Sequence, residues 1–210
     1  MKNLFILFIL AGGAYKVYTE FYQKGNNALD ADGRPLVLLF THQGCGNPCD
    51  TAVKLLNHRK VQYELIAVSD GEEQAKRWGA FGSVRTMPYL VVGNDRVFGY
   101  NKWDYVSALA VHFDNQYLTR SEDAIFQKNF AHEGSAKLVM YTMTGCGYCD
   151  MARDYLQQEG ITFEERNISV SSVAKMELDK FQAGTPLFFY GYKRFEGWSN
   201  NIRREILSVL

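Results

Sequence analysis

The four cysteines are the residues of this chain best suited to chemistry, and they form two closely spaced pairs. One pair, Cys146 and Cys149, stands in the order Cys-Gly-Tyr-Cys directly after the apolar run 137–142. A strand that leads into this spacing at a helix start gives a dithiol that can exchange electrons with other disulfides. A zinc site would need further Cys or His ligands, and the nearest, His132, is isolated. We therefore predict redox chemistry for this pair.

The position of Cys146 at a helix start indicates which sulfur attacks first. A group at this place faces backbone N–H donors that lack helical partners and the positive end of the helix dipole. Both features stabilise a thiolate, which is the reactive form of cysteine. Cys149 lies one turn further along the same helix face, so it can displace a partner bound to Cys146.

The second pair, Cys45 and Cys49, has one more residue between the cysteines and follows a similar apolar run, 37–41. This spacing still allows a disulfide. Pro48 favours the first position of a helix, which would leave Cys45 in the preceding loop. The sequence leaves three interpretations open: a second redox site of altered potential, a static disulfide, or a degenerate domain used for docking.

Both pairs belong to an internal repeat. Cys45 and Cys146 are 146 − 45 = 101 residues apart, and the similarity extends well beyond the cysteines. A repeat of this length indicates two whole domains in tandem. The matching segments are 41–45 with 142–146, 86–90 with 184–188, and 98–101 with 195–198.

The hydrophobic periodicity predicts the element order βαβαββα in each copy. Such an order implies an α/β fold with two tandem thioredoxin-like domains, each a mixed four-stranded sheet flanked by helices. The first copy has predicted strands at 36–41, 62–68 and in a hairpin at 89–98, with helices at 50–59, 72–78 and 102–112. The second has predicted strands at 138–142, 162–168, 187–190 and 193–195, with helices at 149–158, 172–181 and from 199 or 200 to 210.

The predicted domains are 35–114 and 135–210. The polar segment 115–134 is interpreted as a linker, whose centre at 121–126 could form a short capped helix. Two prolines, Pro88 and Pro186, precede a strand at matching places of the repeat, which favours a special role such as a cis peptide bond.

Residues 1–18 are predicted to be a signal peptide or an N-terminal membrane anchor. A positive start precedes the uncharged apolar run 4–11 and the small residues 12–14, which is the layout of a secretory signal. An uncleaved segment, residues 4–18, would tether the chain to a membrane, although the run is shorter than the roughly 20 residues of a spanning helix. A buried N-terminal helix or strand is the third interpretation.

The expected location is therefore exported or inner-membrane-anchored, with the domains in the periplasm or another extracytoplasmic space, where disulfides persist. Lys plus Arg and Asp plus Glu both number 23, so no net charge attracts nucleic acid. An apolar fraction of 47% is typical of a globular protein with a core. Two tryptophans, Trp78 and Trp103, are expected to pack on their sheets.

The second copy closely resembles a glutaredoxin from 137 to 210. The resemblance rests on Tyr-Thr-x-x-Gly-Cys-Gly-Tyr-Cys at 141–149, on Thr185-Pro186 and on Gly-Trp at 197–198. The first copy looks like a more diverged glutaredoxin or thioredoxin-fold domain. The resemblance implies Cys146 as nucleophile, Cys149 as resolving thiol, and a cis proline at Thr185-Pro186 in the substrate-facing loop. Cys45 and Cys49 are kept as candidate catalytic residues under the first of the three interpretations above. Substrate contacts are then expected at Tyr148, Thr185, Pro186, Trp198, Met87 and Pro88.

Two departures from the glutaredoxin pattern concern glutathione. Glutaredoxins often carry Lys two residues after the strand Tyr, where this chain has Met143, and His42 in the first copy. They also tend to carry Asp after a late Gly pair, where this chain has Gly-Trp-Ser-Asn at 197–200. The missing charges would remove charge-assisted hydrogen bonds to a small zwitterionic peptide.

The sequence therefore predicts a thiol–disulfide oxidoreductase that acts on protein disulfides or glutathione mixed disulfides. Glutathione is a candidate co-substrate, an unidentified donor supplies electrons, and no bound cofactor, metal or nucleic acid is expected. The alternative is a protein of another class, either a [2Fe–2S] cluster-binding glutaredoxin, which Gly147 would permit, or a scaffold whose first copy docks partners.

Overall fold

The computed structural model describes residues 27–82 and 86–210. The predicted signal or anchor segment, residues 1–18, lies outside these described residues. Within the described ranges, no helix is long and apolar enough to cross a membrane.

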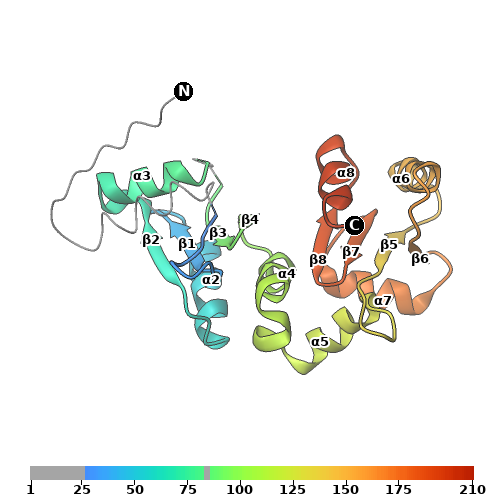
Figure 1. Ribbon diagram of the computed structural model, residues 1–210, viewed down its shortest axis with the longest axis horizontal. Coiled ribbons are helices and arrows are strands. Elements are labelled where there is room, and N and C mark those ends of the chain that lie inside the picture. Colours follow the sequence, from blue (N-terminus) through green and yellow to red (C-terminus); the bar gives the residue numbers. More distant parts are fainter. Residues whose placement is uncertain (1–26, 83–85) are drawn as a thin grey trace. The chain divides into compact units, whose positions relative to one another are not determined.

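The first compact unit contains a mixed four-stranded sheet in the order β2-β1-β3-β4 (Figure 1). β1 pairs in parallel with β2 and antiparallel with β3, which forms a hairpin with β4. Phe40, Tyr89 and Phe81 form part of a core in which Trp78 is half-buried. The elements are β1 (Val37–Thr41), α2 (Asn47–His58), β2 (Glu64–Ala67), the 3-10 turn η1 (Val68–Asp70), α3 (Glu72–Ala80), β3 (Tyr89–Val92) and β4 (Asp95–Phe98).

The second unit repeats this topology with the order β6-β5-β7-β8, and both faces of its sheet are buried. Leu138 and Met140 of β5 pack with α6 and α8 on one face, whereas Val139 and Tyr141 pack with α7 on the other. This alternation follows from the two-residue period of a strand. The elements are β5 (Leu138–Thr142), α6 (Gly147–Gln158), β6 (Glu164–Asn167), α7 (Ser172–Phe181), β7 (Leu187–Tyr190), β8 (Lys193–Glu196) and α8 (Asn200–Leu207).

The helix α4 (Lys102–Phe113), which the repeat assigns to the first copy, belongs to the second compact unit. That unit comprises Asn57–Val61 and Asn101–Leu210. The physical reason is Trp103, whose ring lies 4.8 Å from that of Phe181 in the core of the second sheet. Trp103 therefore packs on the sheet of the other copy, contrary to the expectation from the repeat.

The segment interpreted as a linker is also part of the second unit. It forms the 3-10 turn η2 (Asp114–Tyr117), helix α5 (Arg120–Phe126) and the 3-10 turn η3 (Gln127–Asn129). Thr119 caps α5 in a reciprocal capping box with Glu122, and Phe126 is fully buried. The structure thus shows the expected short capped helix. The segment packs against the core of the second unit and is not a separate linker.

The predicted fold class is confirmed, because both sheets and the element order match the expectation. Both Met87–Pro88 and Thr185–Pro186 are cis, as the paired prolines suggested. Helices α2 and α6 begin two or three residues earlier than predicted, directly after the loop that carries the first cysteine of each pair.

A buried carboxylate, Glu122, holds α4 and α5 together in the second unit. It accepts hydrogen bonds from Arg59 at 2.9 Å and from the Thr119 backbone N–H at 2.8 Å, and pairs with Lys102 at 2.7 Å. Burial alone would raise the pKa of Glu122, but these contacts outweigh it and lower the pKa to about 2. Its unfolded value is 4.5. The carboxylate thus stabilises the fold above pH 4.5, and this contribution is lost as the pH falls toward 2.

We predict that the second unit loses about 3 kcal/mol of unfolding free energy through Glu122 between pH 4.5 and pH 2. Urea unfolding at several pH values measures this loss. Glu122→Gln is less stable at pH 7, because Arg59 stays buried without its carboxylate. It should also show a shallower pH dependence in this window, and an acid profile equal to that of the unmodified chain would refute the assignment.

Candidate active site

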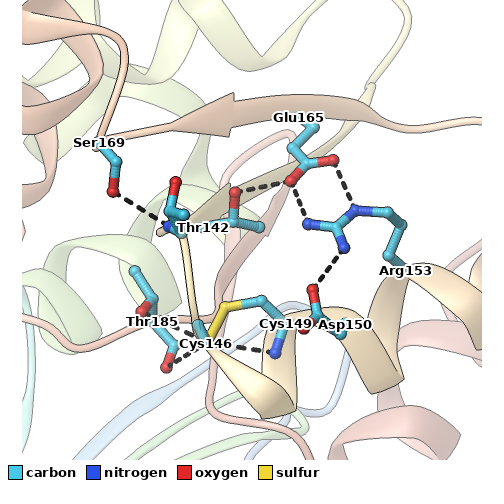
Figure 2. Close-up of a disulfide and its surroundings, with 9 residues drawn as sticks. Thr142, Cys146, Cys149, Asp150, Arg153, Glu165, Ser169 and Thr185 are labelled. Atoms are coloured by element: carbon cyan, nitrogen blue, oxygen red, sulfur yellow. Dashed lines mark hydrogen bonds and ion pairs between the residues drawn. A yellow bond between two sulfur atoms is a disulfide. The ribbon is translucent and has the colours of Figure 1, made fainter.

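Cys146 is the N-cap residue of α6, as its place in the sequence predicted. Its sulfur accepts a hydrogen bond from the backbone N–H of Cys149 at 3.2 Å. The two residues form a disulfide with a Cα–Cα distance of 5.2 Å, drawn at the centre of Figure 2. Cys146 is 8% exposed and Cys149 is fully buried. Of the two residues, only Cys146 has surface exposed to solvent.

The loop before β7 approaches the same sulfur from the opposite side. Both the hydroxyl and the carbonyl oxygen of Thr185 lie 3.7 Å from the Cys146 Sγ (Figure 2). The Pro186 carbonyl accepts a hydrogen bond from the Gly197 N–H at 2.8 Å, which fixes this loop against the end of β8. The fold thus brings Cys146, Cys149, Thr185 and Pro186 together, as predicted.

Two other predicted contact residues differ in their surroundings. Tyr148 projects from the first turn of α6 and is exposed. Trp198 is half-buried, and its ring packs on those of Tyr155 and Phe188, each at 5.7 Å between centroids. Trp198 therefore packs against the core between α6 and β7, whereas the side chain of Tyr148 is exposed to solvent.

The first copy holds the same elements with a different cysteine geometry. Cys45 and Cys49 form a disulfide with a Cα–Cα distance of 5.8 Å. α2 begins at Asn47, so Cys45 lies in the preceding loop and does not cap the helix. This is the consequence predicted from Pro48, although the helix begins one residue before that proline. Met87 is half-buried and Pro88 is buried.

An ion-pair cluster beside the second disulfide was not predicted from the sequence. Arg153 of α6 donates two hydrogen bonds to Glu165 of β6, at 2.6 and 2.9 Å, and one to Asp150 at 2.7 Å (Figure 2). The buried Thr142 hydroxyl donates to the same Glu165 carboxylate at 2.7 Å. Hydrogen bonds from Arg153, with help from Thr142, lower the pKa of Glu165. The cluster ties the first turns of α6 to the end of the sheet.

The signal that could have revealed this cluster is a difference between the copies. Strand register equates Glu165 with Leu65, and counting from the second cysteine equates Arg153 with Val53. The second copy thus has a charged pair where the first copy has an apolar pair, at positions that lie on neighbouring elements. In the described residues, no cluster of three or more His, Cys, Asp or Glu side chains could hold a metal ion.

Two separate matches decide the family of the chain. The family model named Glutaredoxin matches residues 37–97 and 138–192, which together make up more than half of the chain. The chain belongs to the glutaredoxin family. Each match contains one cysteine pair and one cis proline, so the resemblance predicted for both copies is confirmed.

Solved structures of similar proteins each correspond to about one copy of this glutaredoxin-family chain. The thioredoxin-like protein BC3987 is 18% identical, with 35% of this chain and 100% of that chain covered and a TM-score of 0.32. A single-residue mutant of it is 18% identical, with 34% of this chain and 99% of that chain covered and a TM-score of 0.32. The glutaredoxin of Archaeoglobus fulgidus is 23% identical, with 36% and 89% covered and a TM-score of 0.31. A search of curated proteins found no match.

Removal of Arg153 tests whether the ion-pair cluster affects the thiol. Arg153→Met leaves the carboxylates of Glu165 and Asp150 without their cation, next to the first turn of α6. We expect a loss of about 1 kcal/mol in stability. We also expect about threefold slower alkylation of reduced Cys146 at pH 7, because two unneutralised carboxylates disfavour the thiolate.

The matched control copies the first repeat by combining Arg153→Val with Glu165→Leu. Because this pair removes both charge signs together, it should alkylate faster than Arg153→Met. If the two variants alkylate at the same rate, the cluster acts only through packing.

Proposed function

We propose that this chain is a thiol–disulfide oxidoreductase whose exchange reaction takes place at Cys146 and Cys149. The observation that carries the proposal is the asymmetry of this pair. One residue caps a helix and keeps 8% of its surface exposed, and the other is fully buried one turn behind it and bonded to the first. An attacking thiol and a resolving thiol require this difference in access.

The reaction balances with two protein thiols and one substrate disulfide. The Cys146 thiolate attacks one substrate sulfur, which forms a mixed disulfide and releases the first substrate thiolate to be protonated. Cys149 then loses its proton and attacks the Cys146 sulfur, which releases the second substrate thiol. The substrate gains two electrons, and the protein is left with the Cys146–Cys149 disulfide seen in the structure. The Cys149 N–H stabilises negative charge on the Cys146 sulfur before attack.

Protein disulfides and glutathione mixed disulfides are the proposed substrates, and an external thiol donor returns the pair to its reduced state. The exposed position of Tyr148 beside the sulfur supports a partner larger than a single thiol. We further propose that the domains act outside the cytoplasm, with residues 4–18 as signal or tether. The apolar run 4–11 of the sequence supports this location.

Single substitutions separate the two thiol roles. Cys146→Ser should reduce disulfide turnover at least about a thousandfold, because the attacking sulfur is lost. Cys149→Ser should instead accumulate a mixed disulfide at Cys146, because no second thiol is left to attack the Cys146 sulfur and release the substrate. Mass spectrometry of the full chain after reaction with a disulfide peptide measures the adduct. A mixed disulfide on Cys149 in the Cys146→Ser chain, formed at the normal rate, would reverse the assignment.

The reduction potentials of the two pairs should differ. Only Cys146 gains thiolate stabilisation as a helix cap, so its pair is predicted to be more oxidising than Cys45–Cys49 by at least about 30 mV. Redox titration of two full-length variants, each with one pair replaced by serine, gives both potentials. Equal potentials would show that the helix cap does not control the couple and would favour electron relay between the pairs.

A further inference from the structure

The loop that carries Thr185 is held on both sides by residues at the end of β8. On one side, the Gly197 N–H donates a hydrogen bond to the Pro186 carbonyl at 2.8 Å. On the other side, the Gly184 N–H donates to the Glu196 carboxylate, whose Oε1 lies 3.2 Å away. Thr185 lies between these two contacts, and its hydroxyl and carbonyl oxygen face the reactive sulfur at 3.7 Å each (Figure 2). One backbone contact and one side-chain contact thus fix this loop beside the sulfur.

The carboxylate of Glu196 is itself held in place by a buried cation. The Arg194 side chain is 3% exposed, and it donates from Nη2 to the Glu196 Oε2 at 2.7 Å. Its Nη1 donates to Asp104 of α4. A guanidinium that is removed from water needs carboxylate partners. A chain of contacts therefore runs from α4 through Arg194 and Glu196 to the loop that carries Thr185.

The helix α4 has a fixed position relative to this loop. The Trp103 indole N–H donates to the Lys180 carbonyl near the end of α7. The Ser107 hydroxyl donates to the Tyr192 carbonyl, in the turn between β7 and β8, at 2.6 Å. These contacts lie on the elements that precede and follow the cis-proline loop. Asp104, which lies between Trp103 and Ser107 on α4, is therefore well placed to hold the buried cation.

The fold does not require the carboxylate contact, because the first copy manages without it. The backbone contact is the same there, since the Gly99 N–H donates to the Pro88 carbonyl at 2.8 Å. Strand register, however, places Phe98 at the position of Glu196, and a phenylalanine side chain offers no acceptor. The contact made by Glu196 is therefore a property of the second site and not of the shared architecture.

The position of Thr185 affects the reactivity of Cys146 through a hydrogen bond. The Thr185 hydroxyl is a donor to the Cys146 sulfur, and a donor stabilises an ionised acceptor more than a neutral one. The strength of such a bond depends steeply on geometry, so an outward movement of the loop would weaken it. The negative charge of Glu196 has the opposite effect, since a nearby carboxylate disfavours a thiolate. Positioning and charge can therefore be separated by the sign of the change.

We infer that Glu196 is a positioning residue of the Cys146 site, which keeps the Thr185 hydroxyl within hydrogen-bond range of the attacking sulfur. Asp104 contributes from α4, because it fixes the guanidinium that binds Glu196. The inference rests on the proposed function, since it concerns the reactivity of the same attacking thiol. It gives α4, the helix that the repeat assigns to the first copy, a part in the chemistry of the second.

The test measures how fast iodoacetamide alkylates Cys146 in the reduced full chain, by mass spectrometry of the peptide that contains it. Glu196→Ala should slow this reaction at least about threefold at pH 7, because the thiolate loses its hydrogen bond. The Glu196 side chain is 44% exposed, so the replacement leaves the core intact. The rate should also need a higher pH to reach its plateau.

The matched control is Glu196→Gln, which retains an oxygen acceptor for the Gly184 N–H but carries no charge. Its alkylation rate should stay within about twofold of the unmodified chain or exceed it, because only the unfavourable charge is lost. Loss of charge alone would make both variants faster. A rate for Glu196→Ala equal to or above that of the unmodified chain therefore overturns the inference.

A double-mutant cycle shows whether Glu196 acts through Thr185. Thr185→Val removes the hydroxyl and retains the shape of the side chain, so it should also slow alkylation. Glu196→Ala combined with Thr185→Val should be no slower than Thr185→Val alone, because the hydroxyl to be positioned is already absent. If the two effects multiply, Glu196 acts independently of Thr185 and the inference is wrong.

Asp104→Ala tests the part assigned to α4. It should slow alkylation about twofold, again only when Thr185 is present, because Arg194 then holds Glu196 less firmly. An unchanged rate would overturn the role given to Asp104. Disulfide turnover by the unmodified chain is measured in parallel. Normal turnover together with an unaffected Glu196→Ala overturns this inference alone, whereas absence of turnover overturns the proposed function.

Discussion

The unpaired backbone N–H groups at the start of α6 are the constraint on which the rest of the site depends. A helix leaves its first N–H groups without internal acceptors, and here the sulfur of Cys146 takes one of them. That arrangement requires the end of β5 to lie close to the first turn of α6, with only a short loop between them. The sheet, the buried residues of α6 and the tie between Arg153 and Glu165 all fix the relation of this strand to this helix.

The two copies show how little change is needed to alter such a site. In the first copy one additional residue separates the cysteines, α2 begins after Cys45, and the sulfur is no longer a cap. The sheet order and the cis proline are retained. Both copies therefore share the sheet and the cis proline that surround a disulfide. The position at which the following helix begins determines the electrostatic environment of the first sulfur.

The sequence predicted the parts of this arrangement that depend on local pattern. Cysteine spacing and strand periodicity were enough for the element order, and the resemblance to glutaredoxins implied that Thr185 lies at the Cys146 site. Contacts that depend on strand register were missed, since no local pattern places Arg153 beside Glu165. The placement of α4 was missed for another reason. The repeat equates α4 with α8, but Trp103 gives α4 an apolar face that the second sheet accepts.

The packing of Trp103 also means that the chain cannot be cut into two intact domains at the boundary that the repeat suggests. A fragment cut at residue 135 would retain the glutaredoxin motif but lose Trp103 and Phe126. The part of the apolar face around Val139 and Phe189 that α7 does not cover would then meet water. A fragment that keeps Trp103 and Phe126 with this dithiol therefore begins near Asn101, and it still lacks Arg59, which pairs with Glu122 in the same unit. Recombination that exchanged the two copies at the boundary suggested by the repeat would separate the second sheet from α4, the helix that packs on it.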